Sequence, residues 1–150
     1  VIGGFEVFDR EGVHGCRPAP EEKDPDRLRD RFYMRWKTPF SLSACLIRKN
    51  LVKQVGGLDE SLHRCIDGDY VLRLLEATNN VGTVNDIVYR YRKHRTSPLE
   101  RVRYRLKTAW YRPQVVWENY SGYHRLAAVP FGLVMDAGKL VYELFDTYKK

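Results

Sequence analysis

The chain has 150 residues, of which 43% are hydrophobic and 30% are charged. This balance is ordinary for a folded globular domain and excludes wholesale disorder. No apolar run is long enough to span a bilayer, and the net charge of +7 favours anionic partners.

The cysteines are Cys16, Cys45 and Cys65, an odd set without a CxxC pair. They indicate neither a disulfide framework nor a cysteine zinc site, and a reducing compartment such as the cytoplasm is the simpler interpretation. The sequence opens at Val1, without methionine and directly in a strand-like run. We therefore expect an upstream portion that is not part of this chain.

The N-terminal region predicts a strand, a loop and a short helix. Residues 1–8 are typical of a strand, and the turn-like segment 9–12 closes it. Residues 14–27 are polar and rich in proline, so we expect a surface loop. Residues 27–37 mix charges with aromatic side chains and predict a short helix that Pro39 ends.

The middle of the chain alternates predicted strands and helices. Gly56-Gly57 stops the first of these helices, as glycine commonly does at a helix C-terminus. Asp67-Gly68-Asp69 precedes the second, whose apolar residues have helical spacing. The expected elements are a strand at 41–47, a helix at 48–55, a helix at 70–77 and a strand at 82–92.

Beyond Pro98 the sequence predicts helices only: one at about 99–110, a break near Pro113 followed by another helix, and one at 124–148. The chain therefore has the pattern of an α/β protein with a helical C-terminal tail. We expect the division to fall between residues 1–97 and a basic, aromatic-rich tail at 98–150.

Four short motifs occur in a recognisable order. They are SACLIR at 43–48, VGGLDE at 55–60, IDGDYVLRL at 66–74 and YRKH at 91–94. Together they resemble the second half of the family 2 inverting glycosyltransferases, over residues 1–97. The resemblance implies the C-terminal, acceptor-side part of a GT-A (Rossmann-like) domain with a mixed sheet.

In that family an upstream half binds the nucleotide-diphosphate sugar and holds a divalent metal, Mg or Mn, on a DxD motif. The resemblance thus implies an enzyme part that works with a metal, a nucleotide-sugar donor and a sugar or lipid-linked acceptor, in polysaccharide or cell-envelope biosynthesis. Because that half is not visible here, we expect the isolated chain to be inactive.

Asp67 matches the catalytic base of the family. Inverting transfer needs a carboxylate that takes the proton from the acceptor hydroxyl as its oxygen attacks the anomeric carbon. The alternative is a helix N-cap, a common role for aspartate before a helix. The family usually has glutamate before this aspartate, and here the residue is Ile66. A competing interpretation takes Asp67-Gly68-Asp69 as the metal-binding DxD itself.

The resemblance assigns four residues to the acceptor: Asp69, Trp36, Gly57 and Asp59. Each has a structural alternative. Asp69 can pair with Arg73 along a helix, Gly57 can serve a turn, Asp59 can cap the next segment, and Trp36 can pack in a core.

Arg92 and Arg95 suit a leaving diphosphate, because arginine binds phosphate oxygens in bidentate geometry. His94 resembles a histidine that joins the metal or diphosphate site in some GT-A enzymes. The alternative for all three is a solvated basic strand end.

The basic tail, rich in tyrosine and tryptophan from Arg101 to Trp117, suits an anionic membrane surface, which would make the protein peripheral on the inner membrane face. Its alternative is packing on the catalytic domain or on another subunit of an oligomer. A different class of function is a non-catalytic basic module that binds an anionic surface or nucleic acid. No helix-turn-helix, zinc or RNP-type signature supports nucleic acid.

Overall fold

The computed structural model describes residues 1–35, 38–94 and 96–148. The chain divides into two compact units. The first joins Val1–Leu58 to Tyr70–Arg95, and the second joins Asp59–Asp69 to Thr96–Lys150. The protein is of the α/β class, with a three-stranded mixed sheet and several helices.

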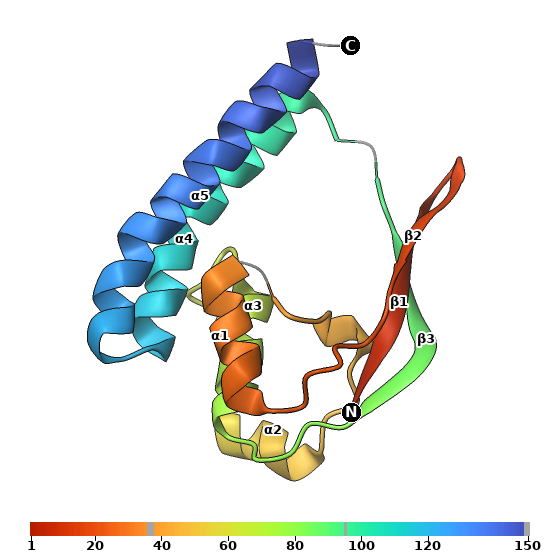
Figure 1. Ribbon diagram of the computed structural model, residues 1–150, viewed down its shortest axis with the longest axis vertical. Coiled ribbons are helices and arrows are strands. Elements are labelled where there is room, and N and C mark those ends of the chain that lie inside the picture. Colours follow the sequence, from red (N-terminus) through yellow and green to blue (C-terminus); the bar gives the residue numbers. More distant parts are fainter. Residues whose placement is uncertain (36–37, 95, 149–150) are drawn as a thin grey trace. The chain divides into compact units, whose positions relative to one another are not determined.

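The sheet belongs to the first unit and has the strand order β2-β1-β3 (Figure 1). Strand β1 (Ile2–Asp9) pairs antiparallel with β2 (Gly12–Arg17) and parallel with β3 (Thr83–Arg92). A Cβ added to Gly3 would clash with the side chain of Val88, so glycine allows β1 and β3 to approach closely here. The predicted strands at 1–8 and 82–92 are confirmed.

Two predictions about the sheet were wrong. Residues 14–17 form part of β2 rather than a loop, because backbone pairing with β1 holds them although every side chain of β2 is exposed. The expected strand at 41–47 is instead a 3-10 helix at Leu42–Ala44, followed by a single bridge between Ile2 and Cys45. The backbone turns back on itself there, since the Ala44 N–H donates to the Ser41 carbonyl at 3.0 Å and the Cys45 N–H to the Leu42 carbonyl at 3.2 Å, so these groups do not extend the sheet.

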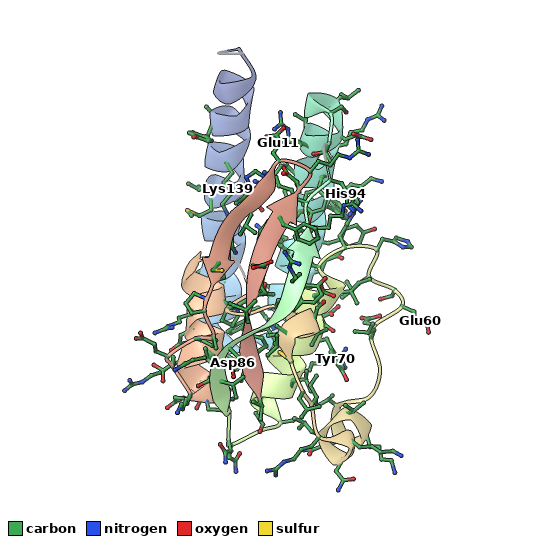
Figure 2. The ribbon with its side chains drawn as sticks, turned by 90° about the vertical axis from the view of Figure 1, so that its right-hand side faces the viewer. Glu11, Glu60, Tyr70, Asp86, His94 and Lys139 are labelled. Atoms are coloured by element: carbon green, nitrogen blue, oxygen red, sulfur yellow. The ribbon has the colours of Figure 1, made fainter. Side chains whose placement is uncertain are left out.

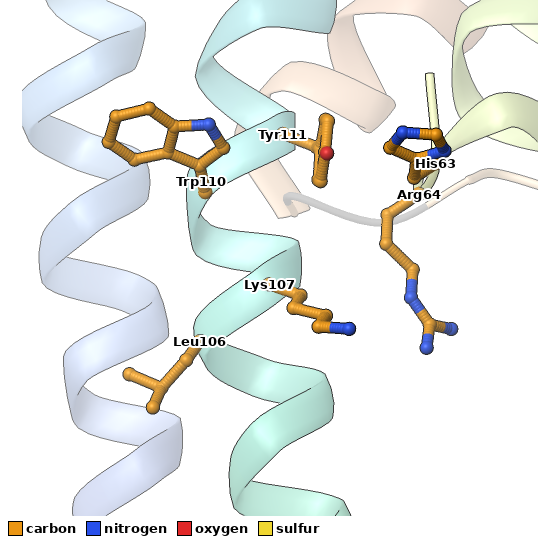
Figure 3. Close-up of a pocket in the computed structure, with 6 residues that line it drawn as sticks. All are labelled: His63, Arg64, Leu106, Lys107, Trp110 and Tyr111. Atoms are coloured by element: carbon orange, nitrogen blue, oxygen red, sulfur yellow. The ribbon is translucent and has the colours of Figure 1, made fainter. Parts of the chain in front are cut away.

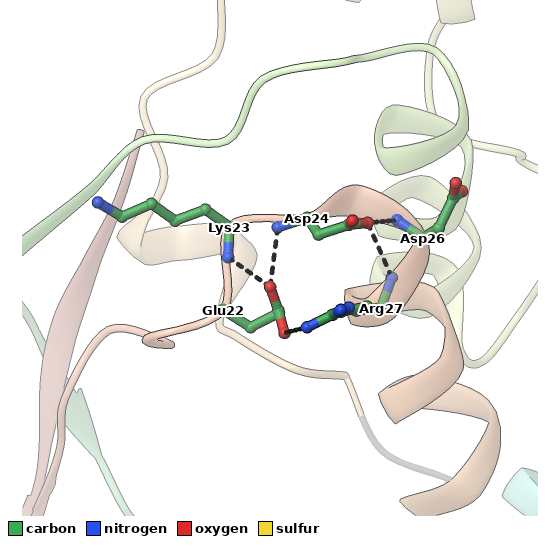
Figure 4. A network of polar contacts seen from close by, with 5 residues as sticks. All are labelled: Glu22, Lys23, Asp24, Asp26 and Arg27. Carbon is green, nitrogen blue, oxygen red and sulfur yellow. Dashed lines mark hydrogen bonds and ion pairs between the residues drawn. The ribbon is translucent and has the colours of Figure 1, made fainter.

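Helix α1 (Pro25–Arg35) begins earlier than predicted, because acidic side chains cap it (Figure 4). An Asp24 carboxylate oxygen accepts from the backbone N–H of Asp26 at 2.9 Å and of Arg27 at 3.2 Å. Pro25 takes the first helical position, where its missing N–H costs nothing. The Glu22 carboxylate accepts from the N–H of Asp24 at 3.1 Å, which stabilises the turn that precedes the helix.

Helix α2 (Lys49–Val55) matches the predicted helix at 48–55. Helix α3 (Ile66–Glu76) begins four residues before the predicted start at 70, so Asp67-Gly68-Asp69 lies in its first turn rather than before it, and Asp67 is not the N-cap. The core of the first unit consists of residues from β1, α1, α3 and the approach to β3. Its buried members are Ile2, Leu28, Val71, Leu75 and Val81. Burying each such side chain stabilises the fold by about 1.5–3 kcal/mol, so the later turns of α3 are firmly anchored.

The second unit contains a helical hairpin of α4 (Pro98–Asn119) and α5 (Gly122–Tyr148) (Figure 1). Ser97 and Glu100 form a capping box at the start of α4. The predicted break near Pro113 was wrong, since α4 runs through it. The preceding residue, Arg112, packs α4 on α5 at this point: its guanidinium contacts Asp136 at 2.8 Å, and both side chains are largely buried.

None of the helices described is both long enough and apolar enough to cross a membrane.

Candidate functional site

The first turn of α3 carries Asp67 and Asp69. The residue before the helix, Cys65, has φ of 62°, which is uncommon for any residue but glycine. This turn starts the helix at Ile66, and the Asp69 N–H donates to the Cys65 carbonyl at 3.0 Å. Asp67 is exposed, whereas Asp69 is 3% exposed.

Asp69 is held by Asn119, the last residue of α4. The Asn119 side-chain amide donates to an Asp69 carboxylate oxygen at 2.8 Å and to the Val115 carbonyl at 2.9 Å. All of these groups are buried. Asp69 therefore links α3 to α4 inside the second unit, and Asp67 is the first-turn carboxylate of α3 that faces solvent.

The competing DxD interpretation does not fit this geometry. In a helix, residues two apart do not face each other, because each residue turns the helix by about 100°. Asp67 and Asp69 consequently point to different sides, one to solvent and one to the interior. They cannot converge on one cation.

Asp59 lies in the loop between α2 and α3, which also carries the exposed Glu60 (Figure 2). One Asp59 carboxylate oxygen accepts from the Ser61 N–H at 2.8 Å and from the Ser61 hydroxyl at 2.7 Å. The Leu62 N–H donates to the Asp59 carbonyl at 3.3 Å. The residue thus closes a local turn at 59–62, whereas the structural role weighed from the sequence was a cap of the next segment.

Gly57 lies at the end of α2, and its carbonyl is held by an arginine of α3. The Arg73 guanidinium donates to the Val55 carbonyl at 2.7 Å and to the Gly57 carbonyl at 2.9 Å. Gly56, the helix C-cap, has φ of 78° and ψ of −169°, a conformation open almost only to glycine. The predicted glycine stop is confirmed, and Arg73 binds the carbonyls on either side of Gly56.

Arg92 and His94 lie at the end of β3, where both side chains are exposed. The ladder reaches one residue past the strand, because the Lys93 N–H donates to the Phe8 carbonyl at 2.7 Å. His94 is the next residue, beyond the C-terminal end of β3 (Figure 2). Nearby, Arg90 forms an ion pair with Glu6. The two other predicted site residues, Trp36 and Arg95, lie outside the described residues.

The candidate residues divide between the two units. Asp59, Asp67 and Asp69 belong to the second, and Gly57, Arg92 and His94 belong to the first. In the described part of the chain, no three histidine, cysteine, aspartate or glutamate side chains gather closely enough to hold a metal ion. These residues thus do not fit a metal centre of their own, and the divalent metal stays a prediction from the resemblance.

Two thiols are unsuited to nucleophilic chemistry. Burial raises the pKa of Cys45 to about 11, although the N-terminal ammonium opposes the shift. Burial also raises the pKa of Cys65, against the charge and hydrogen bond of Arg112. Because the thiolate is the reactive form, neither side chain supports a thiol mechanism.

A pocket in the second unit was not predicted from the sequence (Figure 3). Its volume is about 520 Å³, and it is lined by His63, Arg64, Leu106, Lys107, Trp110 and Tyr111. The His63 and Tyr111 rings meet edge to face with centroids 6.1 Å apart. The basic, aromatic run was visible in the sequence, but the loop at 63–64 that completes the pocket was not.

Comparison of the chain with protein-family models, with curated proteins and with solved structures gave no match.

Proposed function

We propose that the chain is the acceptor-side part of an inverting glycosyltransferase, with Asp67 as the general base. The observation that carries the proposal is the contrast within α3: Asp67 presents its carboxylate to solvent, while Asp69 is buried against Asn119. A base must reach the proton of a bound hydroxyl, and a side chain on the first turn of a packed helix offers a fixed position for it.

The reaction follows from that position. The Asp67 carboxylate accepts the proton of the acceptor hydroxyl as the oxygen attacks the anomeric carbon of the donor sugar. The bond from that carbon to the diphosphate breaks on the opposite face, and the electron pair leaves with the nucleoside diphosphate. The configuration at the anomeric carbon is thereby inverted.

Other residues have supporting roles in this proposal. The resemblance implies that Arg92 binds the leaving diphosphate and that Gly57 contacts the acceptor, and both residues belong to the first unit. In the second unit, the turn at Asp59 would contribute to acceptor binding. The burial of Asp69 favours a role in positioning α3 over direct contact with the acceptor. The unpaired cysteines are compatible with the cytoplasm as the location.

The test is transfer from a nucleotide-sugar donor by the protein that includes the expected upstream portion. We expect Asp67→Asn to lower kcat by about 10²–10⁴-fold, the usual contribution of a general base. Glu118→Gln, which neutralises another exposed acid of the second unit, is the control and should keep normal kcat. Normal transfer by Asp67→Asn would refute the assignment.

A second candidate is a basic binding module without chemistry, which the exposed cations and aromatic rings of α4 favour. If it bound nucleic acid, affinity would fall steeply with salt. Titration with a single-stranded oligonucleotide near physiological salt tests this version, and absence of binding there would remove it.

A further inference from the structure

An apolar stripe runs along the exposed side of α4. It consists of Leu99, Leu106, Trp110 and Trp117, whose side chains are 60%, 57%, 71% and 49% exposed. Their spacing of seven, four and seven residues places all four on one face of the helix. Four large apolar side chains exposed in one line over about 27 Å of helix indicate a contact surface rather than scattered surface residues.

Positive charge borders this stripe. Between Glu100 and Glu118 the sequence has five cations and no acid, namely Arg101, Arg103, Arg105, Lys107 and Arg112. Two of them, Arg103 and Lys107, are exposed and fall beside the stripe, because they lie three or four residues from Leu99, Leu106 or Trp110. The surface is therefore apolar in its middle and cationic at its margin.

The pocket adjoins the stripe and adds a third cation, Arg64. Leu106 and Trp110 of the stripe line it together with Lys107, and the loop contributes Arg64. The Lys107 ammonium and the Arg64 guanidinium extend on the same side of α4 (Figure 3). Arg64 also lies over the Tyr104 ring, 4.8 Å from its centroid. None of the pocket's lining residues is acidic, so the pocket suits a phosphate group.

This combination identifies the partner. A second copy of the chain would bring two positive faces together, which charge repulsion opposes. An anionic bilayer surface suits both the apolar stripe and its cationic margin, since amphipathic helices lie with their apolar face at the boundary between headgroups and acyl chains. Tryptophan is enriched at that depth, and cations at the rim meet lipid phosphates.

We propose that α4 docks the second unit on an anionic phospholipid surface. Trp110 and Leu106 enter the acyl boundary, and Lys107 with Arg64 binds headgroup phosphates in the adjoining pocket. This inference is independent of the proposed transfer chemistry, because none of its residues has a role in that reaction.

The experiment is co-sedimentation of the 150-residue chain with vesicles at about 0.1 M salt, where the Debye length is about 10 Å. One set contains three parts phosphatidylcholine to one part phosphatidylglycerol, and the other contains phosphatidylcholine alone. We expect binding to the anionic vesicles that weakens as salt is raised. Lys107→Ala should weaken it about fivefold, the value of about 1 kcal/mol per cation near such a surface.

Trp110→Ala and Leu106→Ala should also weaken vesicle binding. Their controls are Lys53→Ala and Leu46→Ala, which remove an exposed cation and an exposed leucine of the first unit and should bind like the parent chain. Equal binding to both vesicle types by the parent chain would overturn the proposal. So would variants of α4 that match their controls, or a concentration-dependent dimer lost in Trp110→Ala without vesicle binding.

Discussion

The buried contact between Asp69 and Asn119 allows a sharp quantitative prediction. The donor and acceptor are 2.8 Å apart, and both side chains are almost fully buried. A hydrogen bond to a charged group contributes about 1.5–3 kcal/mol, and burial removes the solvent screening that would reduce it. We therefore expect Asp69→Ala and Asn119→Ala each to lower the free energy of unfolding by about 2–3 kcal/mol.

The double variant should lose less free energy of unfolding than the two single variants together, because either single change already breaks the hydrogen bond. A double-mutant cycle should give a coupling energy of about 1–3 kcal/mol. Urea unfolding followed by tryptophan fluorescence measures it, since Trp110 and Trp117 both report on the second unit. The slopes with urea should agree among the variants, which shows that the unfolded states are comparable.

Asp67→Ala combined with Asn119→Ala is the matched control. Asp67 lies two residues earlier on the same helix but is exposed, so this cycle should be additive to within about 0.5 kcal/mol. If the cycle of Asp69 with Asn119 were equally additive, the contact would not link α3 to α4, and the reasoning about Asp67 would lose its basis.

Two further predictions concern the first unit. Gly56→Ala should lower the free energy of unfolding by about 1–3 kcal/mol, because φ of 78° at this position strains a residue with a Cβ. Gly57→Ala, at a position equally open in space, should lower it by less than about 0.5 kcal/mol. Thermal unfolding measures both, and equal losses would contradict the argument. Burial raises the pKa of Cys45 from 9.0 to about 11, so stability present below about pH 9 should be lost as pH rises to about 11. After discounting for partial exposure the loss is about 1 kcal/mol, and urea unfolding of Cys45→Ser, which does not titrate there, should lack it.

Much of the first unit follows from local sequence rules. The apolar residues of α3 were expected to have helical spacing, and two of them four positions apart, Val71 and Leu75, are core residues. The glycine stop after α2 held for the conformational reason expected of it. Where side-chain periodicity or a special backbone angle determines the local structure, the sequence is sufficient to predict it.

The failures share a different cause. Strand β2 has no buried side chain, so no alternation of apolar and polar residues marks it; its pairing with β1 is carried by the backbone. Next to Pro113, where α4 continues against expectation, Arg112 contacts Asp136, 24 residues away, and no local pattern shows that contact. The partner of Asp69 is 50 residues distant, and no local pattern could have identified Asn119.

These long-range contacts change how the two acids of α3 are related. Side chains two positions apart on a helix diverge, so whatever buries Asp69 also directs Asp67 outward. Asn119 supplies that burial from the end of α4, and the end of α4 is in turn held by the helical hairpin. The exposure of the proposed base thus depends on a helix of the tail, which the sequence had set apart as a separate region. A change that loosens α4 should therefore affect transfer even though it touches no substrate, and the tail is part of the proposed site's support.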